Sequence, residues 1–333
     1  MDDVRQTSGV GLAALLLFWP VVLVAAVLVG FAVWYQSDGL RRWLWLALVS
    51  AIAIGLLVLQ QRGDSRFAWC GLVIALGVAV LWWISIKPSN DRDWAPDVEH
   101  GVTAELQDGD ALLHNIRDFD WRSETDFTPH WETRIYPIAA LSSVDLISSV
   151  WSNPAIAHTL ISFGFDDGRF VVFSAEIRKE RHESFSELGG FFKMFELVLI
   201  AADERDILRL RTNIRHETVS MFRLRLTPEQ RRALFLSFLD MGNRLAGTPE
   251  FYQTITSNCT TIIFKLARLI EPGTPLDWRI LLSGYLPDYL YEHGIVDKNL
   301  PLEMVKQRAL ITRLGEEAGS APDYSKRIRV AVP

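Results

Sequence analysis

Hydrophobic residues are concentrated in the first ninety positions of the chain, where they form three long runs at 9–35, 43–59 and 67–86. Each run is close to the roughly 20 apolar residues that a helix needs to cross the hydrocarbon core of a bilayer. Tryptophan and tyrosine residues gather near the ends of the runs, as is typical of the membrane–water interface. The pattern therefore predicts a three-helix transmembrane anchor over residues 1–90.

The three runs are expected to be retained as membrane helices. The first run is longer than the apolar core of a cleaved signal peptide, which has about 7–15 residues, and two more runs follow it. Pro20 falls inside the first run, where a membrane helix tolerates proline. Lysine and arginine are divided almost evenly between the two sides of the spans, so the positive-inside rule does not set their orientation.

A polar segment separates the apolar runs from the rest of the chain. Pro88 and Pro96 break regular structure there, so we expect residues 91–114 to be a linker. The remaining residues, 115–333, are numerous enough for one well-packed domain. The overall hydrophobic content of 49% thus averages a membrane segment with an ordinary soluble domain.

The pattern within the domain begins with strands. Residues 158–165 and 169–177 are rich in strand-forming residues, and an Asp-Asp-Gly sequence separates them. This arrangement predicts a β-hairpin. The runs 195–201 and 219–226 are typical of further strands.

Two helices are predicted after these strands. Thr227 is placed to cap the first, with Pro228 at its first position and Gln230 completing a capping box. This helix is expected to end near Gly247, and a second helix with an apolar face follows Asn258. Strands followed by helices predict an α+β domain.

Charge and cysteine content exclude several kinds of function. The net charge is −6, and basic and acidic residues are interleaved, whereas a nucleic-acid-binding protein usually carries a basic patch. The two cysteines, Cys70 in an apolar run and Cys259 in the domain, are not placed to form a disulfide. No group of cysteine and histidine has the spacing of metal ligands. We therefore expect no nucleic-acid partner, no metal and no cofactor.

Cys259 lies where the second helix of the domain is expected to begin. A thiol in the first turn of a helix is close to the positive end of the helix dipole, which favours the reactive thiolate. Unpaired N–H groups at the same end can hold an oxyanion. Cys259 is therefore a candidate nucleophile, and the alternative interpretation is a small buried core residue.

His158 is the histidine best placed to act as the general base, because it begins a strand that a tight turn pairs with the next one. A third group normally orients the imidazole. Glu176 on the partner strand is our first choice for this role, and Ser174 is the alternative. A histidine at the start of a strand can equally be a structural residue.

Two charged segments allow both a functional and a structural interpretation. In the segment 115–122 (NIRDFDWR), Asn115 and Arg117 are candidates for binding a lipid head group or an acyl acceptor, together with Asn258 beside the thiol. The structural alternative is a network of turns and salt bridges. The segment 203–211 resembles a set of metal ligands, but its alternating charges favour ion pairs.

Four motifs in order carry a resemblance to a known family: AHTLISFGF, SAEIRKE, ADERDILRLRTN and SNCTT. Together they resemble the bacterial family named for the periplasmic domain of a lipoprotein N-acyltransferase, from about Asn115 to Gly294. More distantly, a histidine on a strand before an Asn-Cys on a helix is similar to circularly permuted papain-like enzymes, which include lecithin–retinol acyltransferase. The resemblance implies a permuted papain-like domain in which His158 is the base and Cys259 the nucleophile.

The resemblance also implies a location, with the domain in the periplasm and the anchor in the bacterial inner membrane. In the acyltransferase that gives the family its name the membrane segments follow the domain, whereas here they precede it. The substrate can therefore differ even where the thiol chemistry is shared.

The function expected from these observations is a two-step acyl transfer. Cys259 would take an acyl chain from a membrane phospholipid as a thioester and pass it to an amine, such as a lipoprotein N-terminus, or to water. The first rival is a cysteine peptidase or amidase that acts on cell-wall peptide with the same pair of residues. The second rival is a non-catalytic envelope scaffold in which the thiol is merely buried.

Overall fold

The structure, a computed structural model, describes residues 9–270, 273, 275 and 277–330. The described residues form two compact units. The first unit holds the N-terminal helices up to Pro88 together with Ser186–Met194, and the second holds Ser89–Phe185 and the chain from Phe195 onward.

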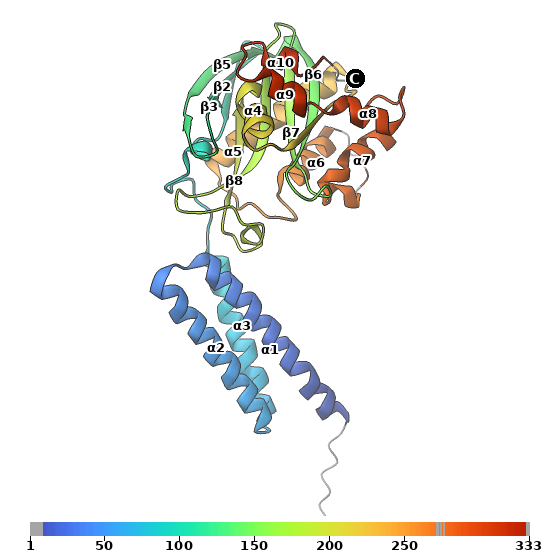
Figure 1. The fold of residues 1–333 in the computed structure, drawn as a ribbon. Helices are drawn as coiled ribbons and strands as arrows, with labels where there is room; N and C mark the ends of the chain where they lie inside the picture. The colour runs from blue at the N-terminus through green and yellow to red at the C-terminus, as the bar shows by residue number, and fades with distance from the viewer. Residues whose placement is uncertain (1–8, 271–272, 274, 276, 331–333) are drawn as a thin grey trace, which may run out of the picture. The chain divides into compact units, whose positions relative to one another are not determined.

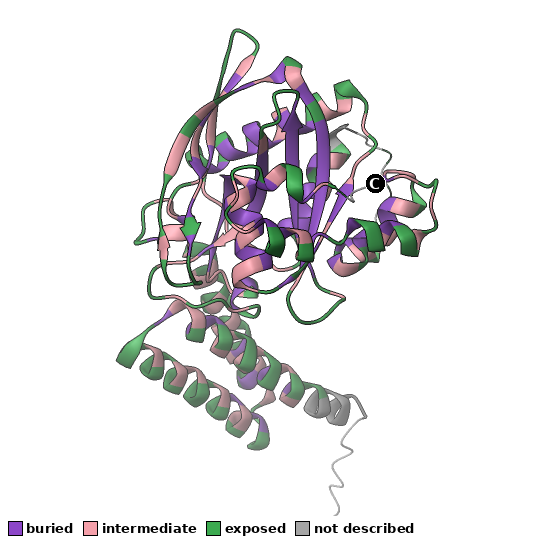
Figure 2. Ribbon diagram, turned by 45° about the horizontal axis from the view of Figure 1, so that its top comes forward, coloured by how far each residue is buried: buried purple, intermediate pink, exposed green. Residues whose placement is uncertain are grey.

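The first unit contains three helices, α1 (Gly9–Gln36), α2 (Gly39–Gln61) and α3 (Ser65–Ser85), which lie side by side (Figure 1). All three are long and apolar enough to cross a membrane, which confirms the three predicted spans. Most of their side chains are exposed or half-buried (Figure 2), as expected for a surface that faces lipid. A small core joins the three helices through Phe18, Val22, Leu56, Ala68 and Leu72.

The second unit is built on an eight-stranded sheet whose main path, among the described residues, runs β1-β2-β9-β8-β7-β6-β10, with β5 paired to β2. The pairing is antiparallel except between β2 and β9. A separate ribbon pairs two short strands, β3 (Asp120–Trp121) and β4 (Phe127–Thr128). The strands of the main sheet are β1 (Thr103–Gln107), β2 (Asp110–Arg117), β5 (Trp131–Pro137), β6 (Leu141–Val150), β7 (His158–Phe165), β8 (Phe170–Arg178), β9 (Glu196–Ala202) and β10 (Thr218–Arg223).

The predicted hairpin is confirmed as β7 and β8, with Gly168 at a φ of 84° in the turn between them. The two further predicted strands correspond to β9 and β10. The segment 91–114 differs from the expected linker, because it contains β1 and the first part of β2. Ala111 and Leu113 are fully buried there, so the sheet begins earlier than the proline residues suggested.

Helices cover both faces of the sheet, and the central strands β6, β7, β8 and β9 are almost completely buried (Figure 2). One face packs against α5, α6, α7 and α8, and the other packs against α4, α9 and α10. This arrangement confirms the α+β class predicted for the domain. The helices are α4 (Glu204–Arg209), α5 (Pro228–Gly247), α6 (Cys259–Ile270), α7 (Leu286–Glu292), α8 (Leu302–Ala309), α9 (Thr312–Ala318) and α10 (Tyr324–Arg327).

The two predicted helices of the domain begin where local sequence places them. The Thr227 hydroxyl accepts from the Gln230 backbone N–H, and the Gln230 side chain accepts from the Thr227 backbone N–H, which is the predicted capping box of α5. Phe235 and Phe238 of α5 pack edge-on against Phe163 of the sheet, with ring centroids 5.1 and 5.7 Å apart. Such aromatic pairs add to the free energy of burial.

A buried carboxylate ties the edge of the sheet to α4. Asp206 is fully buried and accepts four hydrogen bonds, from Arg117 Nε at 2.8 Å, Arg117 Nη2 at 3.0 Å, the Phe119 backbone N–H at 2.9 Å and Trp121 Nε1 at 2.6 Å. A buried charge is stable only when it is paired and hydrogen-bonded in this way.

We expect Asp206→Ala to lower the free energy of unfolding by about 3–5 kcal/mol, because it leaves the Arg117 charge buried without its partner. Asp120→Ala is the matched control. Its carboxylate is exposed and, among the described residues, forms an ion pair with Arg209 at 3.4 Å, so the expected loss is less than about 1 kcal/mol. Urea titration of the full chain in detergent, followed by circular dichroism, measures both values. Equal effects of the two substitutions would contradict this assignment.

Candidate active site

His158, Ser174 and Glu176 are brought together by the register of two neighbouring strands. In the antiparallel pair of β7 and β8, Ile161 lies opposite Phe173. Continued three residues further, this register places His158 opposite Glu176. Because side chains alternate between the faces of a strand, Ser174 lies on the same face as Glu176.

The hydrogen bonds at His158 identify its protonated nitrogen. His158 Nε2 lies 2.7 Å from Ser174 Oγ and 3.1 Å from Glu176 Oε1. The Ser174 hydroxyl donates to Glu176 Oε1 at 2.7 Å, so it must accept from Nε2–H. The geometry therefore leaves Nδ1 as the ring nitrogen that can exchange a proton with a nucleophile. Both candidates for the third group therefore contact the histidine. Ser174 is hydrogen-bonded to Nε2, and Glu176 contacts Nε2 directly and is also linked to it through the Ser174 hydroxyl.

Cys259 is the first residue of α6, as the sequence indicated. The Thr261 backbone N–H donates to Asn258 Oδ1 at 2.8 Å, and the Asn258 N–H donates to Thr261 Oγ1 at 2.9 Å, so this pair caps the helix reciprocally. The hydroxyls of Thr159 and Thr260 lie 3.0 Å apart and join the start of α6 to the start of β7. The first turn of α6, which carries the thiol, is thus held beside the start of β7, where His158 lies.

The Cys259 thiol and the His158 imidazole are close enough for each to shift the pKa of the other. Burial works to lower the pKa of His158, but the Glu176 carboxylate and the thiol outweigh it and raise this pKa to about 9. Burial works to raise the pKa of the Cys259 thiol, but the imidazolium overcomes it and holds this pKa below the ordinary thiol value. Both shifts favour a thiolate–imidazolium pair over the neutral thiol and imidazole.

Glu176 is also paired with a buried arginine, Arg211, so the charged groups of the site extend from the histidine into the protein interior. Arg211 Nη2 lies 3.3 Å from Glu176 Oε1, and Arg211 Nη1 donates to Glu217 Oε2 at 3.1 Å. The Ser149 hydroxyl also donates to Glu217. Burial acts to raise the pKa of Glu176, but His158 and Arg211 hold it well below its usual range. Glu176 is therefore ionised when it faces the imidazole.

Arg211 is the site residue that sequence reasoning missed. It lies in a π-helical turn, Leu210–Ile214, that directly follows α4, and π-helical turns occur frequently at functional sites. In the sequence it stands among alternating charges, which pointed to local ion pairs. Its partner Glu176 lies 35 residues earlier in the chain, so only the fold shows the contact.

Exposed apolar side chains flank both reactive residues. Ile156, two residues before His158, is 37% exposed, and Ile255, four residues before Cys259, is 52% exposed. A cluster of exposed apolar side chains also lies in the segment that leads into α7: Trp278, Leu281, Leu282 and Tyr285. Exposed apolar residues that cluster on a surface are typical of a site that binds an apolar ligand.

The segment that carries this apolar cluster, 278–285, is hydrogen-bonded directly to the residues before His158. The Ser283 hydroxyl accepts from the Ala157 backbone N–H at 2.8 Å and donates to the Ala157 carbonyl oxygen at 2.6 Å. The Gly284 N–H donates to the Ala155 carbonyl oxygen at 3.0 Å. A Cβ at Gly284 would lie 1.8 Å from the Pro154 carbonyl oxygen, so only glycine permits this approach. The apolar segment and the start of β7 therefore form one surface.

The three predicted substrate-binding residues have structural partners. All three side-chain nitrogens of Arg117 are hydrogen-bonded, to Asp206 and to the Asp97 carbonyl oxygen. Asn115 Nδ2 donates to the Gly101 carbonyl oxygen at 3.0 Å, and Asn258 caps α6. These contacts agree with the structural interpretation of the segment 115–122, and substrate binding by these residues stays a prediction.

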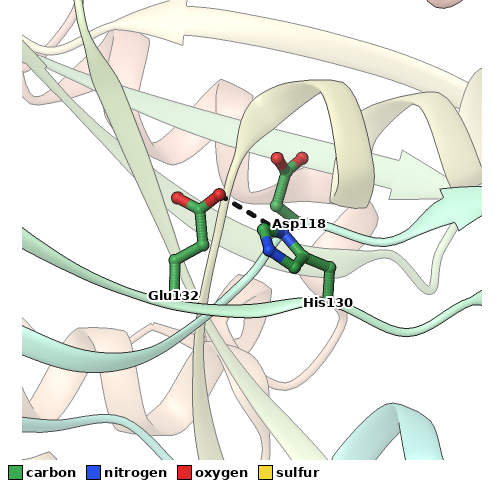
Figure 3. A group of neighbouring side chains, drawn as sticks. All are labelled: Asp118, His130 and Glu132. Atoms are coloured by element: carbon green, nitrogen blue, oxygen red, sulfur yellow. Dashed lines mark ion pairs between the residues drawn. The ribbon is translucent and has the colours of Figure 1, made fainter.

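A group of possible metal-ligand residues lies at the edge of the sheet, where Asp118, His130 and Glu132 face one another (Figure 3). Its carboxylates already have cationic partners. Both Asp118 oxygens accept from Arg205 at 3.0 Å, and Arg134 Nε donates to Glu132 at 2.5 Å. The group is therefore part of an ion-pair network, and we assign it no metal.

The acidic residues of the segment 203–211 also pair with arginine. Asp203 Oδ2 accepts from Arg134 at 2.9 Å, and Glu204 accepts from Arg329 at 2.5 and 2.6 Å. The alternating charges indicated ion pairs, but these partners come from distant parts of the chain and not from the neighbouring arginine residues.

The fold and the site define a class of protein: a membrane-anchored α+β domain with a thiol, an imidazole and a carboxylate in contact. Residues 127–284 match the family described as the Lnb N-terminal periplasmic domain. The match confirms the family resemblance inferred from the sequence motifs and covers every residue of the row from Cys259 to Glu217. Together with the three apolar helices, the match indicates a membrane protein with a periplasmic domain. Comparison with curated proteins and with solved structures gave no match.

The pKa shifts predict how alkylation of Cys259 depends on pH. The thiol pKa is lowered, so the thiolate should persist as the pH falls below the ordinary thiol value of about 8.5. In a Cys70→Ala parent, iodoacetamide should therefore label Cys259 quickly at pH 6.5. His158→Asn removes the imidazolium, and burial then raises the thiol pKa, so labelling at this pH should slow at least about tenfold.

Glu176→Gln is the intermediate case, because it removes the charge that stabilises the imidazolium but leaves the ring in place. Its labelling profile should move toward higher pH in the same direction as that of His158→Asn. Mass spectrometry of the labelled peptide measures all three rates. Identical pH profiles for the parent and His158→Asn would show that the thiol is not activated by the imidazole.

Proposed function

We propose that the protein is a thiol acyltransferase of the bacterial inner membrane whose catalytic domain lies in the periplasm. The observation that carries the proposal is that Ser174 and Glu176 orient His158, whose imidazole in turn lowers the pKa of the Cys259 thiol. A thiolate paired with an oriented imidazolium is suited to acyl transfer through a covalent thioester. The similarity of this arrangement to permuted papain-like enzymes supports the same chemistry.

In the first step, the Cys259 thiolate attacks the ester carbonyl of a phospholipid. A carbon–sulfur bond forms and the ester carbon–oxygen bond breaks. The imidazolium of His158 donates its proton to the leaving alkoxide, so the lysophospholipid departs as an alcohol. Glu176 stays ionised throughout and orients the ring, as the third member of such a set does.

In the second step, an amine attacks the thioester. The neutral imidazole takes a proton from the attacking nitrogen as the carbon–nitrogen bond forms and the carbon–sulfur bond breaks. The thiolate–imidazolium pair is thereby restored. A lipoprotein N-terminus is an amine of this kind, and water in its place would make the enzyme a hydrolase.

The start of α6 supports stabilisation of the oxyanion that forms in each step. The N–H groups in the first turn of a helix have no intrahelical acceptor. Thr261 already donates to the Asn258 side chain, which leaves the N–H groups of Cys259 and Thr260 beside the reacting carbonyl. Preorganised donors of this kind are a large contribution to acyl-transfer catalysis.

A lipid substrate is favoured over a peptide by the apolar surface at the site. Ile156, Ile255 and Leu282 present exposed apolar side chains close in the chain to His158, to Cys259 and to the Ser283 contact, respectively. A polar peptide gains little from such a surface, whereas an acyl chain gains about 0.8 kcal/mol for each buried CH₂ group. Three membrane helices also anchor the domain to a bilayer, which is where phospholipid esters are concentrated.

The proposal predicts a covalent acyl adduct. After incubation with phospholipid vesicles, intact-mass measurement of the wild-type protein should show an added acyl chain that hydroxylamine removes. Cys259→Ala and His158→Ala should show none, because one lacks the nucleophile and the other lacks its base. Cys70→Ala is the matched control for a cysteine outside the site and should acquire the adduct as the wild type does.

Two other outcomes would overturn the lipid assignment. A wild-type protein without adduct, but with Cys259 readily alkylated, would indicate a peptide or amide substrate. A Cys259 that neither acquires an acyl chain nor reacts with iodoacetamide would indicate a structural thiol and a non-catalytic domain.

A further inference from the structure

The segment Ser186–Met194 connects two strands of the sheet, β8 and β9, yet it belongs to the unit of membrane helices. Its Phe192 ring stacks on Phe31 and on Tyr35 of α1, with ring centroids 5.6 Å apart in both pairs. The Ser186 and Tyr35 hydroxyls are hydrogen-bonded at 3.2 Å. The segment is thus docked on the C-terminal turns of α1 by aromatic and polar contacts together.

Side-chain-to-backbone hydrogen bonds in both directions also join the segment to the helix ends. Lys193 Nζ donates to the carbonyl oxygens of Trp83 and Ile86, at 2.7 and 3.2 Å, at the end of α3. The Gln36 side-chain amide donates to the carbonyl oxygens of Phe192 and Lys193, both at 2.8 Å. The last carbonyl groups of a helix have no intrahelical donor, and non-helical backbone needs partners of this kind at membrane depth.

The depth of the segment follows from its contact with Phe31. Phe31 lies within the apolar stretch Leu17–Gln36 that is suited to cross the membrane. It precedes the end of α1 by five residues, which is about 7.5 Å along a helix that rises 1.5 Å per residue. Phe192 therefore lies beside membrane-spanning residues and not beyond the end of the helix.

Two apolar side chains of the segment are exposed in this setting. Leu188 is 53% exposed and Phe191 is 42% exposed. Single exposed apolar residues are common on soluble surfaces. Here, however, both lie in one short segment that is docked on a membrane helix, so the apolar surface of the spans continues onto them.

We propose that Ser186–Met194 is a membrane-inserted loop, and that Leu188 and Phe191 lie among the lipid acyl chains at the periplasmic side of the bilayer. The occupant of this surface is lipid, because the surface is continuous with helices that are themselves surrounded by lipid. The loop joins β8, which carries Ser174 and Glu176, to β9, so the site strand is tied to the bilayer through its own connection. This inference does not depend on the acyl-transfer reaction.

Spin labels on single cysteine residues test the depth of the loop. In a Cys70→Ala, Cys259→Ala parent, the positions are Leu188→Cys and Phe191→Cys, with Leu106→Cys as the control. Leu106 is an apolar side chain of β1 that is 63% exposed. The full chain is reconstituted into phosphatidylethanolamine and phosphatidylglycerol vesicles. Collisions of each label are then measured with oxygen, which enters lipid, and with a nickel chelate, which stays in water.

The ratio of oxygen to nickel collisions should be several-fold higher at positions 188 and 191 than at position 106. Equal ratios at the three positions would overturn the proposal, because the loop would then lie in water. Protection of positions 188 and 191 from both reagents would also overturn it, in favour of a protein partner. Since both side chains are exposed, their replacement leaves the packing of the loop intact, and the result is independent of activity.

Discussion

The site depends on a row of buried and half-buried ionisable groups of alternating sign, from the Cys259 thiol through His158 and Glu176 to Arg211. An isolated charge in such surroundings would be neutralised, because the loss of hydration exceeds any local gain. Each group here has neighbours of the opposite sign, so the charges are stable only as a set. The position of Glu176 between two cations explains how one carboxylate both orients the imidazole and remains ionised.

The scaffold brings this row together from four separate elements. Two adjacent strands supply the imidazole and the carboxylate, a helix that packs on them supplies the thiol, and a π-helical turn supplies the guanidinium. Strands and helices in a packed core hold side chains more precisely than loops do. Proton transfer between groups about 3 Å apart requires that precision. The proposed reaction also requires access to lipid esters, and the membrane helices anchor the domain to the bilayer that contains them.

The elements that sequence reasoning found are those with a local cause. Three apolar runs long enough for a bilayer, a hairpin marked by Asp-Asp-Gly and a capping box at Thr227 depend on residues close together in the chain. The start of α6 at Cys259 is local in the same sense, because Asn258 caps the helix from the preceding position. The hairpin register then placed Glu176 beside His158, so the main candidates for the site were accessible from the sequence.

By itself, the sequence therefore determined the three spans, the α+β class and the residues that carry the candidate chemistry. Only the tertiary structure decided which charges meet: it paired Arg211 with Glu176, and Asp206 with Arg117, across 35 and 89 positions. It also placed β1 in the sheet and docked Ser186–Met194 on a membrane helix. The physical reason is that secondary structure follows from hydrogen bonding and side-chain period within a short segment, whereas ion pairs and docking depend on how distant segments pack.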